Sequence, residues 1–203
     1  FMSCVPLELR DGGRDARPFE DHSHALGQTM YLRIADELYL KRCLVGGLER
    51  VYEICKDFRN EGIDRTHMPE FTMMECYQAY ADYNDVMRLV EQMLRFIAIE
   101  VCGSTTVTFQ GYTIDFGPDW QRVSIPEAIV ERTGIDIMQI TELEPLQAAI
   151  RAAGLKVDTK PSWGKQVDEL FSECVQPLLI QPTFIIDHPV PLSPLAKKRI
   201  DQP

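Results

Sequence analysis

Residues 51–79 read VYEICKDFRNEGIDRTHMPEFTMMECYQA, and the interpretation of the whole chain starts from this stretch. In residues 51–59 and again in 70–79, the side chains at alternate positions fall on two opposite faces, and a long polar loop separates the two runs. In the first run Tyr52, Ile54 and Phe58 share one face, and charged residues share the other. A period of two is typical of a half-buried β-strand. The stretch therefore predicts two strands joined by a loop.

One face of the second strand combines residue types that seldom share an ordinary core. That face carries Phe71, Met73, Glu75 and Tyr77. A buried carboxylate is costly unless a cation pairs with it. In a polar pocket, Phe71 would stack on a flat ligand and Glu75 with Tyr77 would accept a cation, while Arg59 would bind a carboxylate or phosphate. The alternative is a surface sheet with a solvated face, and spacing alone leaves both interpretations open.

Further blocks flank this stretch, and they are ARPF at 16–19, YLRIA at 31–35, ELYLKR at 37–42 and SPLAK at 193–197. The central stretch itself contains FRNEG at 58–62, His67, PEFT at 69–72 and Glu75-x-Tyr77. The central stretch resembles motif 2 of the class II aminoacyl-tRNA synthetases. The ordered set of blocks, which runs across almost the whole chain, resembles the lysyl branch of that class.

This resemblance implies an α+β fold, the antiparallel-sheet catalytic core of a class II synthetase with flanking helices and a helical insertion, present in incomplete form. It implies part of the catalytic core with motif 2 at 1–117, the helical insertion at 118–180 and a return to the core at 181–203. Motif 1 is expected before this chain and motif 3 after it. We therefore expect a fragment that is inactive by itself.

The resemblance also implies a reaction. Lysine and ATP, with Mg²⁺, would form lysyl-adenylate, and lysine would then be transferred to tRNA(Lys). Attack of a carboxylate on the α-phosphorus needs positioning and charge neutralisation more than a protein nucleophile. Arg59 is therefore the expected catalytic residue, and the expected ATP-binding residues are Arg59, Glu61, His67 and Phe71. The magnesium ligands are expected downstream, so no metal ligand is expected in this chain.

The lysine-binding residues implied by the resemblance are Gly13, Glu37, Glu75 and Tyr77. Gly13 would contact the amino acid through its backbone, and Glu37 would hold the α-amino group. Glu75 and Tyr77 would lie near the side-chain ammonium. A site that must pair a buried carboxylate rejects uncharged analogues, by roughly 10⁴-fold in favourable cases.

Three alternatives accompany this interpretation. Aspartyl and asparaginyl relatives share FR-x-E and PEFT, but they should lack the Glu75-x-Tyr77 pair and the SPLAK run. A paralogue that lysylates a protein is compact, and the expected helical insertion argues against it. A synthetase-like domain without catalysis is suggested only by Met68, because the family usually has Asn at that position. The family also usually has Pro where this chain has Asp36.

Composition excludes other classes of protein. The 203 residues carry a formal net charge of −10 and contain no Lys/Arg run, so a basic nucleic-acid-binding module is not expected. No apolar run in the sequence reaches the length of a membrane span, and we expect no signal peptide. The six cysteines are scattered without C-x-x-C spacing, which indicates reduced thiols and a cytoplasmic location. A homodimer is expected of the full-length enzyme.

The flanking segments carry clear signals for secondary structure. A helix is expected to follow Asp36, and the helix at 82–101 should bury a stripe formed by Val86, Val90, Met93, Ile97 and Val101. A hairpin is expected over 105–116, around Gln110-Gly111. Capping boxes at 124–127 and 141–144 should open two helices, and a third helix is expected at 163–175. Residues 183–187 should form a strand.

Overall fold

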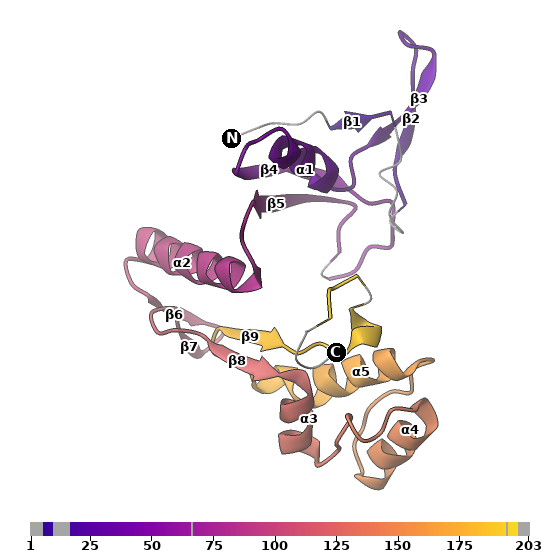
Figure 1. The fold of residues 1–203 in the computed structure, drawn as a ribbon, viewed down its shortest axis with the longest axis vertical. Helices are drawn as coiled ribbons and strands as arrows, with labels where there is room; N and C mark the ends of the chain where they lie inside the picture. The colour runs from indigo at the N-terminus through magenta and orange to yellow at the C-terminus, as the bar shows by residue number, and fades with distance from the viewer. Residues whose placement is uncertain (1–5, 10–16, 66, 194, 199–203) are drawn as a thin grey trace. The chain divides into compact units, whose positions relative to one another are not determined.

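The computed structural model describes residues 6–9, 17–65, 67–193 and 195–198. Its contacts divide the chain into two compact units, Phe1–Asp82 and Tyr83–Pro203 (Figure 1). The α+β class predicted from the sequence is confirmed, since antiparallel strand pairs alternate with helices. Among the described residues, no helix combines the length and apolar character that crossing a membrane requires.

The first unit is built from two strand systems and one helix. Its elements are β1 (Leu7–Glu8), β2 (Glu20–Ser23), β3 (Gln28–Leu32), α1 (Glu37–Val45), β4 (Arg50–Phe58) and β5 (Glu70–Gln78). One antiparallel sheet has the order β1-β3-β2, and β4 pairs antiparallel with β5 along the full length of both strands. Helix α1 packs against both β4 and β5. The predicted strand pair of residues 51–79 is thus confirmed.

The two faces of β4 are buried in the reverse of the usual order. Tyr52 and Ile54, on the apolar face, are 46% and 54% exposed, whereas Glu53 and Asp57, on the charged face, are 1% and 0% exposed. An alternating pattern reports the period of a strand but not which face is covered. The charged face is the one that α1 and the segment after β3 cover.

The second unit contains most of the helices. It comprises α2 (Tyr83–Cys102), β6 (Thr106–Phe109), β7 (Tyr112–Asp115), β8 (Gln121–Ser124), α3 (Ile125–Thr133), α4 (Leu143–Ala152), α5 (Trp163–Cys174), η1 (Gln176–Leu178), β9 (Thr183–Ile186) and η2 (Val190–Leu192). The β6–β7 hairpin turns at Gln110 and Gly111, whose φ angles of 50° and 84° match the predicted turn. Strand β9 pairs parallel with β8, which the sequence did not predict.

An apolar cluster holds the helices of the second unit together. Its buried members are Ile125, Ala128, Ile129, Ile135, Ile137, Leu146, Ile150, Val167, Leu170, Phe171 and Val175. The indole N–H of Trp163 donates to the carbonyl of Ile140 at 2.6 Å and fixes the start of α5. The third helix expected at 163–175 is therefore confirmed, and it contributes Val167, Leu170 and Phe171 to this core.

Two local predictions were wrong. On α2 the buried residues are Met87 and Ala98, while Val86, Ile97 and Val101 of the predicted stripe are 49%, 44% and 77% exposed. The apolar residues of this helix spread around its circumference, so the sequence did not define one face. The capping boxes also failed in detail: α3 begins after Ser124 and α4 after Glu142, but neither N-cap side chain makes a capping hydrogen bond.

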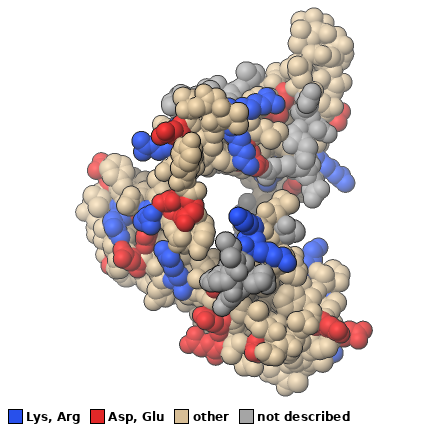
Figure 2. Space-filling model, in the orientation of Figure 1, with Lys and Arg blue, Asp and Glu red and all other residues tan. Residues whose placement is uncertain are grey.

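The charges of the molecule are mixed rather than segregated. On the face drawn in Figure 2, Lys and Arg side chains alternate with Asp and Glu and form no continuous basic stripe. This mixture on the drawn face accompanies a formal net charge of −10 for the whole sequence.

Candidate active site

The candidate site lies on the face of β4 and β5 that packs toward α1. The register of the two strands places Asp57 opposite Phe71, Glu53 opposite Glu75 and Val51 opposite Tyr77. Residues directly opposite in a sheet share a face, so Phe71, Glu75 and Tyr77 lie in one row, as the sequence predicted. The three side chains of this row are half-buried.

Tyr77 links Glu75 to an ammonium group that α1 provides. The hydroxyl of Tyr77 donates to the Glu75 carboxylate at 2.9 Å. The Lys41 ammonium lies 5.7 Å from the centre of the Tyr77 ring and 2.5 Å from the carboxylate of Glu37. The structure thus brings together Glu37, Glu75 and Tyr77, three of the four residues expected to bind lysine. The fourth, Gly13, lies outside the described residues.

Arg59 and Phe71 form a second contact on the same strand pair. The guanidinium carbon of Arg59 lies 5.3 Å from the centre of the Phe71 ring, and the backbone N–H of Arg59 donates to the Pro69 carbonyl at 2.8 Å. A cation over an aromatic face contributes about 0.5–1 kcal/mol at such a site. The buried Nε of Arg59 has no hydrogen-bond acceptor among the described residues. Arg59 therefore retains a donor for a ligand.

The two remaining ATP-binding candidates lie on the loop between β4 and β5. His67 is exposed, and its Nδ1 lies 2.8 Å from a carboxylate oxygen of Asp64 on the same loop. The backbone N–H of Glu61 donates to the Arg59 carbonyl at 2.9 Å, while the Glu61 side chain faces solvent. The structure places these residues next to Arg59 in the chain, but the contact that it gives His67 is with Asp64.

A buried charge network beneath this row escaped the sequence analysis. Arg33 donates from Nη1 to the Glu53 carboxylate at 3.1 Å, and its Nε lies 3.0 Å from Asp36 and 3.2 Å from Asp57. All four side chains are at most 2% exposed. A signal was present, because Arg33 and Asp36 are three residues apart and Glu53 and Asp57 share a strand face. Their pairing across about twenty residues was not readable from local pattern.

The network carries more negative than positive charge. Burial disfavours the ionised form of Asp57, and the nearby Asp36 carboxylate adds repulsion, so the pKa of Asp57 rises to about 6 although Arg33 opposes the shift. Burial likewise raises the pKa of Glu8, which lies near the network. For Arg33, burial acts to lower the pKa, but the Asp36 and Glu53 carboxylates outweigh it, and the pKa is raised.

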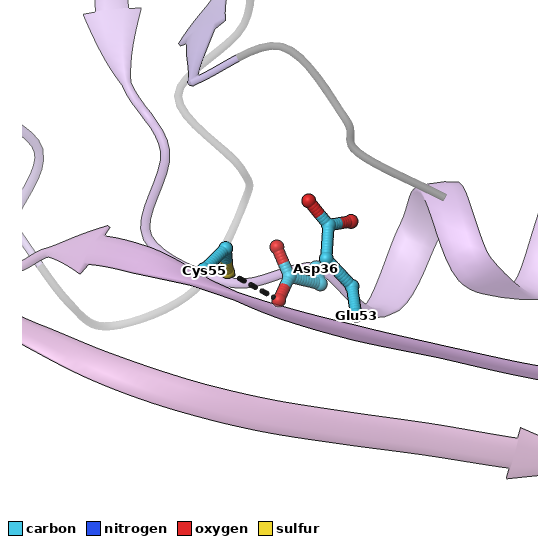
Figure 3. Close-up of side chains that lie close together, drawn as sticks. All are labelled: Asp36, Glu53 and Cys55. Carbon is cyan, nitrogen blue, oxygen red and sulfur yellow. Dashed lines mark hydrogen bonds between the residues drawn. The ribbon is translucent and has the colours of Figure 1, made fainter. Parts of the chain in front are cut away.

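Cys55 contributes a thiol to the same network. Its Sγ donates to the Asp36 carboxylate at 2.8 Å, as the dashed line in Figure 3 marks. Burial, followed by this hydrogen bond, raises the pKa of the Cys55 thiol. One ligand atom each from Asp36, Glu53 and Cys55 lie within 4.8 Å of one another, which is close enough for a shared metal ion. Metal binding to sulfur requires the thiolate, and the Arg33 guanidinium already contacts both carboxylates, so this donor set fits a hydrogen-bonded network better than a metal centre.

A paired strand unit that carries Arg59 against the Phe71 ring, and Tyr77 bonded to Glu75, is the arrangement expected of a class II aminoacyl-tRNA synthetase. The family model of the class II tRNA synthetases (D, K and N) matches residues 6–203, so this chain belongs to that family.

Similar proteins within the family are lysine–tRNA ligases. The chain is 76% identical over 192 residues to the lysine–tRNA ligase of Roseiflexus sp. (strain RS-1) and 64% identical over 192 residues to that of Chloroflexus aurantiacus. It is 49% identical over 199 residues to the lysine–tRNA ligase of Pelotomaculum thermopropionicum. These matches cover 95%, 95% and 97% of this chain but 39% of each relative, so the chain spans about two fifths of the length of the relatives it matches.

Proposed function

We propose that this chain forms the motif 2 part of an enzyme that activates lysine with ATP as lysyl-adenylate and transfers the lysine to tRNA(Lys). The observation that carries the proposal is the series of contacts that joins Glu37 of α1, through Lys41 and Tyr77, to Glu75 on the strand pair next to Arg59. The similarity to proteins named lysine–tRNA ligase points to the same amino acid.

Arg59 is proposed as the residue that assists the reaction. Its planar guanidinium would bridge the lysine carboxylate and the α-phosphate, and it would stabilise the negative charge that builds up as the carboxylate attacks phosphorus. Two features support this role. Its stacking on Phe71 limits the motion of the side chain, and its buried Nε has no acceptor among the described residues.

Phe71 is proposed to stack on the adenine of ATP. Stacking of a base on an aromatic side chain contributes about 1–3 kcal/mol. Because Arg59 covers one face of the Phe71 ring, adenine would use the other face or displace the guanidinium toward the phosphates. Glu61 and His67 are proposed to contact the nucleotide from the loop. The magnesium ions that accompany ATP would neutralise phosphate charge, and we assign no ligand for them within this chain.

Selectivity for lysine is proposed to reside in Glu75 and Tyr77. The Tyr77 hydroxyl holds the Glu75 carboxylate at 2.9 Å, which fixes its direction. An amino acid without a terminal ammonium would leave this half-buried carboxylate unpaired, and that loss lowers its affinity. Gly13 is proposed to bind the amino acid through its backbone.

The wider assignments follow from the family and remain proposals. Residues 1–117 and 181–203 are proposed to belong to the catalytic core, and 118–180 to a helical insertion. The whole protein is proposed to act as a cytoplasmic homodimer.

The test is lysine-dependent exchange of pyrophosphate into ATP, measured on the whole protein that carries this chain. We expect Arg59→Ala to lower the exchange rate by roughly 10²–10³-fold or more, with an unchanged circular-dichroism spectrum. Arg95→Ala is the matched control, because Arg95 is a partly exposed arginine bonded to the Phe116 carbonyl in the second unit. Unchanged exchange in Arg59→Ala would contradict the proposal. Lysine binding without any exchange in the unmodified protein would favour the non-catalytic alternative.

A further inference from the structure

Among the described residues of the candidate site, Lys41 supplies the same chemical group as the proposed substrate, an ammonium on a flexible stem. Its ammonium lies 2.5 Å from the carboxylate of Glu37, which precedes it by four residues on α1. An i,i+4 Glu–Lys pair is common on exposed helices and contributes only a few tenths of a kcal/mol there. This pair differs from the common case, because Glu37 is 22% exposed and Tyr77 of β5 presents its ring to the same ammonium.

The contacts of Lys41 belong to a continuous series that joins α1 to β5. It runs from the Glu37 carboxylate to the Lys41 ammonium, then to the ring of Tyr77, and from the Tyr77 hydroxyl to the Glu75 carboxylate. One carboxylate, that of Glu37, is thus paired with the Lys41 ammonium, and the other, that of Glu75, accepts from the Tyr77 hydroxyl. Under the proposed function, these two carboxylates would bind the two ammonium groups of free lysine, one at each end of this series of contacts.

We propose that Lys41 is an internal placeholder for lysine: its ammonium occupies the Glu37 end of the site until the substrate's ammonium displaces it. This proposal rests on the proposed function. If Lys41 stayed in place, its ammonium would still neutralise the Glu37 carboxylate. A bound lysine would then add two ammonium groups to a site with two carboxylates, Glu37 and Glu75. Repulsion between like charges would then oppose binding.

Displacement of Lys41 is energetically accessible. The Lys41 side chain is 53% exposed, so its flexible four-carbon stem can turn the ammonium into water without crossing packed side chains. Partly exposed ion pairs contribute roughly 0.2–1 kcal/mol. The placeholder therefore lowers the affinity for lysine by a small factor, about two- to five-fold. In exchange, it keeps the Glu37 carboxylate paired and oriented when the site is empty.

The first test compares Lys41→Met with the unmodified whole protein in calorimetric titrations with lysine. Methionine keeps most of the length of the stem and removes the charge. We expect Lys41→Met to bind lysine about two- to five-fold more tightly, with an unchanged KM for ATP in pyrophosphate exchange. Lys56→Met is the matched control, because Lys56 forms an exposed pair with Glu70 on the opposite face of β4 and should leave lysine affinity unchanged.

The second test reports on the position of the Lys41 ammonium itself. Brief acetylation with an N-hydroxysuccinimide ester, read by peptide mass spectrometry, gives the reactivity of Lys41 relative to that of Lys56. Adding a non-hydrolysable lysyl-adenylate analogue should raise this ratio, because Lys41 moves into water. A role confined to stabilising the helix predicts no change in the ratio.

The outcomes separate the two proposals. Weaker or equal lysine binding by Lys41→Met, or protection of Lys41 by the analogue, overturns the placeholder and leaves the proposed function standing. Tighter binding with a raised reactivity ratio supports the placeholder. Failure of both the unmodified protein and Lys41→Met to bind lysine overturns both proposals.

Discussion

The two units of this chain have interiors of opposite character. In the first unit the buried side chains that are polar or charged are Glu8, Arg33, Asp36, Glu53 and Asp57, beside the apolar Ile34, Leu40 and Val51. In the second unit an apolar cluster fills the interior, and the buried polar side chains among the described residues are Ser124 and Gln166. Apolar burial is non-directional, whereas ion pairs and hydrogen bonds fix side-chain positions. The comparison indicates that the first unit is organised to hold groups in place and the second to be stable.

The largest expected effect comes from removing Arg33, the cation that the described part of the chain gives to the buried network. Arg33→Met should destabilise the protein by about 3–5 kcal/mol, because it leaves buried carboxylates without their partner. Urea unfolding followed by circular dichroism measures this loss. Arg88→Met is the control, since Arg88 forms an exposed pair with Asp85 on α2 and should cost less than about 1 kcal/mol. Equal losses of stability in Arg33→Met and Arg88→Met would contradict the proposed difference between the interiors of the two units.

A cavity in the apolar cluster should affect stability but not ligand binding. Leu170 is fully buried, and Leu170→Ala should cost about 2–5 kcal/mol. Leu178→Ala, at a 55% exposed position next to α5, is the control and should cost far less. Lysine affinity of the folded Leu170→Ala protein should equal that of the unmodified protein. A changed lysine affinity would show that the second unit also organises the site.

Because Asp57 is buried in the first unit, the stability of that unit should depend on pH. The pKa of Asp57 is raised from 3.8 to about 6, so the folded state binds the proton more tightly than the unfolded state. The resulting stability is fully present below about pH 3.8 and is lost as pH rises through about 6, a change of about 3 kcal/mol. Asp57→Asn cannot ionise. Between pH 4 and pH 7, the stability of Asp57→Asn should therefore rise by about 2 kcal/mol relative to the unmodified protein.

Unfolding of both proteins at several pH values checks this prediction. Asp119→Asn is the matched control, because Asp119 is a fully exposed aspartate in the second unit. A constant difference in stability between Asp57→Asn and the unmodified protein across this range would mean that Asp57 ionises as readily as in the unfolded chain.

The smallest expected energy concerns the proposed selectivity residue. Glu75→Gln keeps the shape of the side chain and removes its charge, so lysine affinity should fall by roughly 10–100-fold, as expected for a charged hydrogen bond of about 1.5–3 kcal/mol. The KM for ATP should stay unchanged, and the two constants are read from pyrophosphate exchange. Equal loss of lysine and ATP would mean that Glu75 supports the strand pair rather than selecting the substrate.

The sequence predicted the parts of the site that depend on local pattern. The β4–β5 pair, the row of Phe71, Glu75 and Tyr77 on one face, and the hairpin at Gln110-Gly111 are all confirmed. What it did not predict depends on partners from distant segments. The burial of Glu53 and Asp57 follows from Arg33, which lies at least twenty residues earlier in the chain, and alternation alone could not indicate which face of β4 is covered.

Caps and helix faces show the same limit. Asp36 precedes α1, as an N-cap should, but its side chain turns into the buried network instead of capping the helix. The Asp36 side chain contacts Arg33 and Cys55 instead, and only the folded arrangement brings the atoms of these residues within reach. On α2, apolar residues surround the helix, so the packing of the second unit, not the period of the sequence, selects Met87 and Ala98 for burial.

The measurement that tests the central claim most directly is calorimetric binding of non-hydrolysable aminoacyl-adenylate analogues to the whole protein that carries this chain. Lysyl, aspartyl and asparaginyl forms share the nucleotide and differ in the group that would meet Glu75 and Tyr77. We expect the lysyl form to bind most tightly, and this preference should be lost in Glu75→Gln. Equal binding of the three forms, or a preference for the aspartyl or asparaginyl form, would contradict the assignment of this face as a lysine site.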